Sequence, residues 1–312
     1  MGDLAVNVED LHFSYGAQPV LAGLNLQLAQ REIFGVVGAD GQGKSTLLRL
    51  LVGQLDPSAG RISVLGMARA DPGLRDAVAY MPQTFGQYLD LSVLENLAFF
   101  GALHGLARAQ AARVMADLLA RTGLQGFEHR RAAQLSGGMM QKLALACALV
   151  SRPRVMFLDE PTTGVDPLSR RAFWQLLEGV RAEGVAIVYA TSNMEEAERC
   201  DRVGTLEGGR FSREGRPPDL VTAVDATLFS VSGEGVRGWR TRLQSVPGVE
   251  FAFPVGLELK VWVAGAVAAD ALAGALAQLA PQLRAERIEP RLHDVVLREL
   301  ALAHRSPAHG RA

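Results

Sequence analysis

The sequence predicts an α/β fold followed by a smaller α+β unit at its C-terminal end. Residues 1–220 alternate apolar, strand-like runs with helix-like segments. A glycine-rich loop at residues 38–45 joins one of these runs to a helix. Beyond about residue 220 apolar and polar residues alternate as in strands with one exposed face, and amphipathic helical patterns accompany them.

Three short apolar runs are the best strand candidates of the first part. They are Ile33–Val37, Val155–Leu158 and Ala186–Tyr189, and each is typical of a strand buried in a core. Between about Leu91 and Leu135 apolar residues recur at helical spacing. We therefore expect a helical subdomain over about residues 84–150 within the α/β unit.

Glycine and proline punctuation at residues 208–218 predicts a boundary near residue 220, with an accessory unit over residues 221–312. Its expected strands are Thr227–Val231 and Leu257–Val263, and its expected helices are Ala268–Leu283 and Leu292–Ala303. The tail from Ser306 to Ala312 is expected to be disordered.

Charge and cysteine content limit the possible classes. The formal net charge is −1 over 312 residues, which argues against a dedicated nucleic-acid binder. The two cysteines, Cys147 and Cys200, stand apart from histidines and from each other, so we expect neither a disulfide framework nor a zinc site. A reducing cytosol is the natural compartment for such a chain.

The sequence contains no evident membrane or export segment. The start, MGDLAVNVED, lacks the basic and then apolar pattern of a signal peptide. No uncharged apolar run reaches the ~18 residues that a membrane span needs, because Lys260, Asp270 and Arg284 interrupt the best candidates. We therefore expect a soluble chain whose membrane role, if any, comes through a partner.

The loop Gly38-Ala39-Asp40-Gly41-Gln42-Gly43-Lys44-Ser45, followed by Thr46, matches the phosphate-loop pattern GxxxxGK[ST]. Its glycines allow backbone N–H groups to curl around phosphates, beside the positive end of the next helix. Lys44, one of three lysines in the chain, can reach the β- and γ-phosphates, and Ser45 can ligate Mg²⁺. The pattern predicts binding of a nucleoside triphosphate.

A second motif, Val155-Met156-Phe157-Leu158-Asp159-Glu160-Pro161, is an apolar strand that ends in two acids. Beside a phosphate loop, Asp159 would lie near the metal and Glu160 could polarise an attacking water. Taken alone, the pattern also suits an ordinary strand end.

A third motif, Leu135-Ser136-Gly137-Gly138-Met139-Met140-Gln141-Lys142, has Ser136 as a good helix N-cap. Two glycines after it permit a close approach of the backbone to a ligand. A plain helix start explains this stretch equally well when it is taken alone.

These three motifs, in this order and spacing, resemble the ATP-binding cassette (ABC) ATPases over residues 1 to about 220. The fold implied is a P-loop NTPase cassette with a RecA-like core and a helical subdomain. Tyr15 matches the aromatic that stacks on adenine, Gln83 matches the glutamine that reports γ-phosphate and Mg²⁺, and Asp166 lies in the loop that crosses the dimer.

The resemblance implies bound ATP and Mg²⁺ and assigns roles to residues of the motifs. The nucleotide-binding set is Tyr15, Gly38, Asp40, Gly41, Gly43, Lys44, Ser45, Thr46, Ser136, Gly137, Gly138 and Asp166. The metal-binding set is Ser45, Gln83 and Asp159. The catalytic set is Glu160, Lys44, Gln83 and Ser192.

The family works as a dimer that closes on ATP and drives an integral membrane permease. The resemblance thus implies a second cassette, identical or different, and a place at the inner face of the cell membrane, held there through the permease. Met139 and the stretches Met81–Tyr88 and Gly164–Arg171 resemble the bacterial efflux branch. Both stretches are most similar to the first cassette of tandem exporters of the YbhF type.

Ser192 is the one departure from the family pattern, which carries histidine there to contact the γ-phosphate. The acidic run Glu195–Glu198 after it is expected to be a solvated helix face. A serine predicts slow turnover at this site and a partner cassette that carries the histidine. Two other readings remain: a catalytically weak regulatory cassette, and a non-transport ABC ATPase acting on ribosomes or DNA.

Overall fold

The computed structural model describes residues 4–69, 71–84, 86–265, 272, 274, 276 and 280–305. The chain forms two compact units, one up to Gly215 and one from Arg216 onward. The boundary predicted near residue 220 falls within helix α8 (Pro217–Thr222), the first helix of the second unit. The predicted tail, Ser306–Ala312, and most of the helix predicted at Ala268–Leu283 lie outside the described residues.

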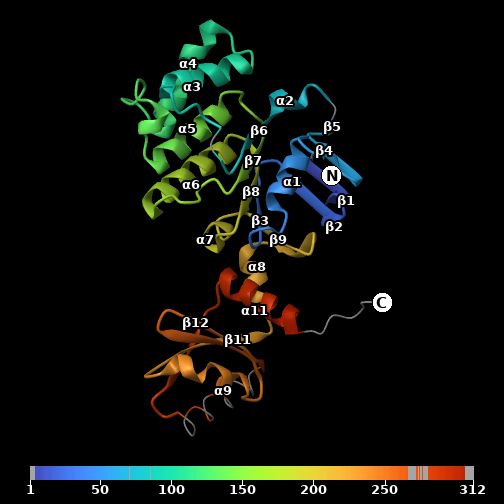
Figure 1. The fold of residues 1–312 in the computed structure, drawn as a ribbon, viewed down its shortest axis with the longest axis vertical. Helices are drawn as coiled ribbons and strands as arrows, with labels where there is room; N and C mark the ends of the chain where they lie inside the picture. Colours follow the sequence, from blue (N-terminus) through green and yellow to red (C-terminus); the bar gives the residue numbers. More distant parts are fainter. Residues whose placement is uncertain are drawn as a thin grey trace. The chain divides into compact units, whose positions relative to one another are not determined.

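A six-stranded sheet in the order β10-β9-β3-β8-β7-β6 forms the centre of the first unit (Figure 1). All neighbours are parallel except β10, which pairs antiparallel with β9. The strands are β3 (Ile33–Val37), β6 (Val78–Met81), β7 (Val155–Asp159), β8 (Ala186–Thr191), β9 (Arg202–Glu207) and β10 (Arg210–Gly215). Every residue of β3, β7 and β8 is buried, because parallel sheets are covered on both faces. The three predicted strands are confirmed.

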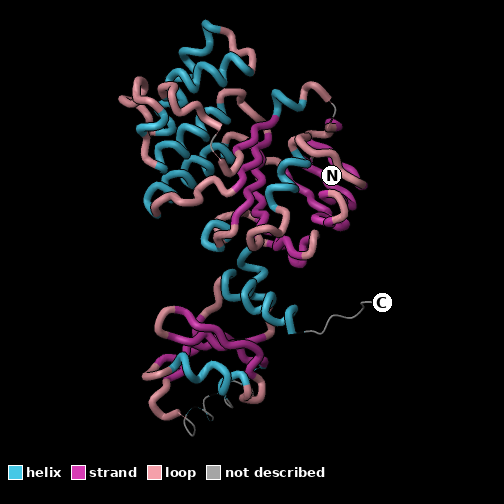
Figure 2. The backbone as a smooth tube through the Cα atoms, in the orientation of Figure 1, coloured by secondary structure: helices cyan, strands magenta, loops and turns pink. Residues whose placement is uncertain are grey.

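A second, antiparallel sheet in the order β2-β1-β4-β5 was not among the predicted elements. Its strands are β1 (Leu4–Tyr15), β2 (Gln18–Ala29), β4 (Ala59–Val64) and β5 (Met67–Ala68). Helix α1 (Lys44–Leu51) lies between the two sheets, and its buried leucines share one hydrophobic core with both. Figure 2 shows the strands of both sheets around this helix. The phosphate-loop helix is therefore clamped on two sides.

Helices α3 (Val93–Leu103), α4 (Arg108–Thr122) and α5 (Gly137–Leu149) gather on the other side of the parallel sheet (Figure 1). A capping box at Ser92 and Glu95 begins α3. The fully buried Asn96 side chain donates to the carbonyls of Tyr88 and Ser92, which fixes the loop before α3. The remaining helices of the unit are α2 (Leu74–Ala77), η1 (Ala132–Gln134), α6 (Pro167–Ala182) and α7 (Met194–Ala197).

The second unit is an antiparallel sheet in the order β12-β13-β11-β14 with helices on both faces. The strands are β11 (Ala226–Ser232), β12 (Val249–Val255), β13 (Glu258–Ala264) and β14 (Arg284–Ile288). One face packs against η2 (Val236–Trp239) and α9 (Arg240–Gln244), and the other against α8 and α11 (Leu292–Arg305). This strand order is that of split β-α-β folds. The predicted α+β character is confirmed.

Helix α11 is fixed to its sheet by a buried polar contact. Lys260 on β13 donates to Asp294, which is 1% exposed, over 2.5 Å. The indole of Trp262 donates to the Asp294 carbonyl over 3.2 Å.

In the described part of the chain, no helix is long and apolar enough to cross a membrane.

Both cysteines are free and buried, and their environments predict low reactivity. Burial raises the pKa of the Cys147 thiol to about 12 and raises that of Cys200 as well. Since the thiolate is the reactive form, we expect the native chain to react with a disulfide reagent at pH 8 at least about a hundredfold more slowly than the chain in denaturant. Prompt reaction of a native thiol would contradict the described packing.

Candidate functional site

The phosphate loop begins α1 with a backbone shape that only glycine adopts easily. Gly43, the N-cap of α1, has a φ of 99°. A Cβ atom there would lie 2.8 Å from Val20 Cγ1 on β2, so a side chain is excluded by space as well as by conformation. The antiparallel sheet therefore presses the loop against the start of α1, where backbone N–H groups are free to bind an anion.

Lys44 is 5% exposed and lies across the loop. Its ammonium group donates to the carbonyls of Gly38 at 2.8 Å and Ala39 at 3.1 Å. It also lies 3.3 Å from Glu160 Oε1 and 3.6 Å from Asp40 Oδ1. A buried cation held by these contacts is placed beneath the loop, in reach of an anion bound there.

Asp159 at the end of β7 is 1% exposed and contacts two other elements. Its Oδ1 accepts a 3.0 Å hydrogen bond from Ser45 Oγ on α1, and its Oδ2 accepts one of 3.3 Å from the Tyr80 hydroxyl on β6. Burial, and then the negative charge of Asp159, raise the pKa of Tyr80. Because β6 and β7 are parallel neighbours, their carboxyl ends meet at one edge.

Glu160 follows in a strained conformation, with a φ of 49°, and is 7% exposed. Its backbone N–H donates to the Ala190 carbonyl at 3.0 Å, and its Oε2 accepts a 3.2 Å hydrogen bond from Thr163. Its Oε1 has the ion contact with Lys44 but no hydrogen-bond partner among the described residues. An unsatisfied buried carboxylate oxygen is costly in a folded protein and common at sites of chemistry.

A cavity of about 510 Å³ brings most of the predicted nucleotide set together. It is lined by Tyr15, Gln18, Val20, Asp40, Gly41, Gly43, Lys44, Ser45, Thr46, Gln83 and Glu160. Tyr15 is 47% exposed, and its ring edge packs on Phe13. Gly38 lies just below the cavity, where it accepts from Lys44.

The predicted cross-dimer residues do not line that cavity within this chain. Ser136 caps α5 by accepting from the Met139 N–H, and Asp166 caps α6 by accepting from the Ser169 N–H. The Ser169 contacts lower the pKa of Asp166. Gly138 packs on Ser169 so closely that a Cβ would lie 2.3 Å from its Oγ. The two motifs thus form one surface at the start of α5 and α6.

Ser192 lies in the exposed turn after β8, and its hydroxyl has no hydrogen-bond partner within the described part of the chain. The turn itself is held firmly: the Thr191 hydroxyl donates to Glu196 Oε2 at 2.7 Å, and the Asn193 N–H donates to Thr191 Oγ1 at 3.0 Å. Position 192 is therefore presented on a fixed backbone while its side chain is free.

The expectation that Glu195–Glu198 forms a solvated face is wrong for Glu196. Its carboxylate is 3% exposed and also accepts from the Thr162 hydroxyl, while the Arg170 guanidinium lies 3.6 Å away. Thr162 lies in the loop between β7 and α6, and Arg170 lies in the first turn of α6, so Glu196 joins these segments to the Ser192 turn. A run of acids gives no sequence signal that one of them turns inward.

The donor set fits ATP and Mg²⁺. Mg²⁺ prefers oxygen ligands, and the Ser45 hydroxyl and Asp159 carboxylate supply them at the edge of the cavity. The left-handed glycines and the buried Lys44 suit a polyphosphate. Lys44 and the unsatisfied Glu160 oxygen lie on the same side of this set.

These features define the class: a P-loop protein that binds ATP at the carboxyl edge of a parallel sheet. The ABC transporter family pattern matches residues 21–163, which span the phosphate loop, Gln83, the Ser136 motif and Glu160. The chain belongs to the ATP-binding proteins of ABC transporters, a family of ATPases that power transport.

Two relatives give the range of similarity. The probable multidrug ABC transporter ATP-binding protein YbhF of Escherichia coli is 34% identical over 303 residues, covering 95% of this chain and 52% of the relative. This chain thus spans about half the length of YbhF. The Nod factor export ATP-binding protein I of Rhizobium etli is 39% identical over 220 residues, 70% of each chain.

Solved structures agree on the fold. An ATP-binding subunit of an ABC transporter superposes with a TM-score of 0.64 at 32% identity, covering 70% of this chain and 92% of that one. CbiO1 from Clostridium perfringens, part of the cbiONQ transporter complex, gives a TM-score of 0.66 at 28% identity, covering 77% and 96%. The predicted cassette fold is confirmed.

The buried position of Glu196 gives a stability prediction with a matched neighbour as control. Glu196→Ala removes two hydrogen bonds to a buried charge and the closer of the two carboxylates beside Arg170, so it should lower the unfolding free energy of the first unit by about 3 kcal/mol. Glu195→Ala alters a side chain that is 79% exposed and should change it by less than about 1 kcal/mol. Urea unfolding measures both, and equal effects would contradict the inward role of Glu196.

Proposed function

We propose that this chain is the ATP-binding and ATP-hydrolysing subunit of a membrane exporter. The observation that carries the proposal is the convergence of Lys44, Ser45 and Glu160 around one cavity, with Asp159 hydrogen-bonded to Ser45 behind its wall. A cation, a hydroxyl beside a carboxylate and a second, unsatisfied carboxylate are the groups that phosphoryl transfer to water requires, because positioning and electrostatics dominate that reaction.

Each residue then has a role at this edge. Lys44 and the loop N–H groups bind the phosphates, and Tyr15 stacks on the adenine. Ser45, Asp159 and Gln83 would hold Mg²⁺, which would neutralise charge on the phosphate oxygens. Glu160 accepts the proton of the attacking water, and its Oε1, which has no hydrogen-bond partner among the described residues, is suited to that contact.

The surface of Ser136, Gly137, Gly138 and Asp166 serves the nucleotide of a second cassette in our proposal. These residues lie at the starts of α5 and α6 and not at the cavity of their own chain. An anion favours such helix starts, where backbone N–H groups are exposed. ATP would hold two cassettes together, and its hydrolysis would release them. The second cassette can be identical or different.

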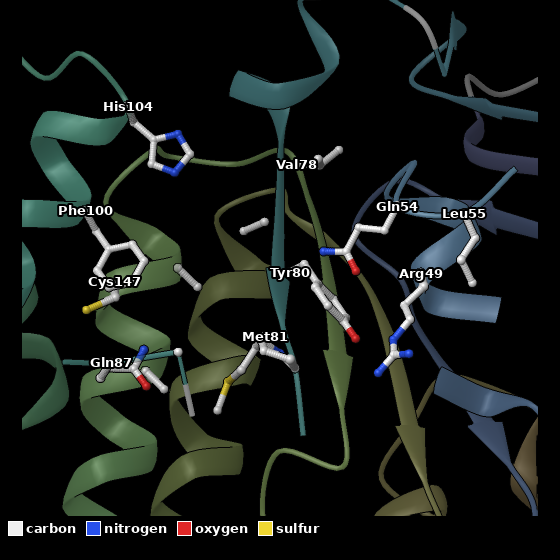
Figure 3. A pocket seen from close by; sticks show the side chains of 15 residues that line it. Arg49, Gln54, Leu55, Val78, Tyr80, Met81, Gln87, Phe100, His104 and Cys147 are labelled. Atoms are coloured by element: carbon white, nitrogen blue, oxygen red, sulfur yellow. The ribbon is translucent and has the colours of Figure 1, made fainter. Parts of the chain in front are cut away.

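A second cavity, of about 620 Å³, supports the proposal that the chain binds a membrane partner (Figure 3). It lies between β6 and the helical region, where Met81, Pro82, Gln87, Phe100 and His104 contribute to its wall. The loop that carries Gln83 follows this wall directly, so an occupant would contact the residues on either side of it. We propose that a cytoplasmic helix of an integral membrane permease enters here, which places the chain at the inner face of the cell membrane.

An export role is supported by relatives named for multidrug and Nod factor export. The second candidate, a slow or regulatory cassette paired with an active one, is favoured by Ser192. A serine hydroxyl is shorter than an imidazole and carries no charge, so it contacts a γ-phosphate only through a bridging water.

Ser192→His tests this candidate. Removal of a donor to developing charge typically costs ~10²–10³ in rate, and a bridging water recovers part of that. We therefore expect Ser192→His to raise the steady-state ATPase rate of the purified chain at least about tenfold, while Ser192→Ala stays at or below the rate of the unmodified chain. Robust ATPase activity that Ser192→His leaves unchanged would contradict the reading.

Glu160→Gln tests dimer closure. The substitution removes the proton acceptor but keeps the shape of the side chain, so ATP should persist and hold two chains together. Gel filtration with ATP and Mg²⁺ should then give a dimer that ADP does not support. A monomer under both conditions would mean that this chain does not close on itself.

A further inference from the structure

Tyr80 lies between the two cavities and belongs to neither predicted set. It stands on β6, three positions before Gln83, in the stretch Tyr80-Met81-Pro82-Gln83. Its side chain is half-buried and lines the larger cavity. Its hydroxyl donates a hydrogen bond of 3.3 Å to the Asp159 carboxylate.

Asp159 depends on Tyr80 for its orientation. The carboxylate is 1% exposed and has one described donor for each oxygen: Ser45 for Oδ1 and Tyr80 for Oδ2. Ser45 is itself a predicted metal ligand, and its hydroxyl would then serve the metal through its oxygen and Asp159 through its hydrogen. The contact from Tyr80 uses no metal ligand other than Asp159, so it would persist with a metal in place.

A cation on α1 holds Tyr80 in turn. The Arg49 guanidinium interacts with the Tyr80 hydroxyl, and this contact raises the pKa of Arg49. Figure 3 shows the two groups turned toward each other at the wall of the larger cavity. Arg49 lies on the same helix as Ser45. The predicted metal ligand Asp159, helix α1 and the cavity wall are thus joined through one aromatic side chain.

We propose that Tyr80 is a positioning residue that orients Asp159 toward the metal from the wall of the larger cavity. The inference rests on the proposed function, because it requires Mg²⁺ at Asp159. Groups that hydrogen-bond to metal-ligating carboxylates fix their geometry, and their loss typically weakens metal affinity ~10- to 100-fold. Tyr80 does not contact the nucleotide in this proposal, so its effect is confined to the metal.

Tyr80→Phe is the direct test, because phenylalanine keeps the ring that packs at the cavity wall and removes the donor. ATP binding to the purified full chain is measured by calorimetry across a series of Mg²⁺ concentrations and in EDTA. We expect the Mg²⁺ concentration for half-maximal enhancement of binding to rise about tenfold, while ATP affinity in EDTA is unchanged.

Tyr88→Phe is the matched control, since it removes the hydroxyl of a tyrosine that is 46% exposed in the helical region. Its Mg²⁺ requirement should equal that of the unmodified chain. Thermal unfolding of each variant, followed in parallel, separates a loss of stability from a change in metal affinity.

Different results would contradict the role of Tyr80 and the proposed function. An unchanged Mg²⁺ requirement in Tyr80→Phe, with Mg²⁺-dependent binding in the unmodified chain, would overturn the role of Tyr80 alone. A lower melting temperature with an unchanged Mg²⁺ requirement would do the same, because it assigns Tyr80 to packing. An unmodified chain that binds no ATP, or binds it equally with and without Mg²⁺, would overturn the proposed function together with this inference.

Discussion

The hydrogen bond from Ser45 Oγ to Asp159 Oδ1 joins two elements that are 114 residues apart in the chain. It places the first turn of α1 against the carboxyl end of β7, and the two sheets hold it there because they enclose α1. Gly43 and Lys44, just before Ser45, and the strained Glu160, just after Asp159, all adjoin this junction. Loss of the junction would separate the phosphate-binding groups from the carboxylates.

A second buried contact extends this arrangement to the turn that carries Ser192. Glu196 accepts hydrogen bonds from the ends of β8 and of the loop after β7, and so keeps the two segments in register. The backbone at position 192 is consequently as well held as the rest of the site. The departure at Ser192 is confined to the length and charge of one side chain, so in our proposal it bears on turnover and not on the fold.

Sequence reasoning succeeded where a local pattern determines the local structure. The fully apolar runs that became β3, β7 and β8 are buried on both faces, and Ser136 caps α5 as its residue type predicts. It failed where register is irregular or where structure depends on distant contacts. The antiparallel sheet of β1 and β2 has irregular register, the inward turn of Glu196 is set by Thr162 and Arg170, and the contact of Tyr80 with Asp159 arises from strand order.

In our proposal the phosphate loop and the β7 carboxylates form a single Mg²⁺–ATP site. Equilibrium binding of ATP to the unmodified chain and to Lys44→Ala, each with and without Mg²⁺, tests it most directly. The account predicts ATP binding that Mg²⁺ strengthens and that Lys44→Ala weakens by at least about a hundredfold, because a buried cation beneath the phosphates is removed. Equal binding by the two proteins, or no effect of Mg²⁺ on the unmodified chain, would contradict it.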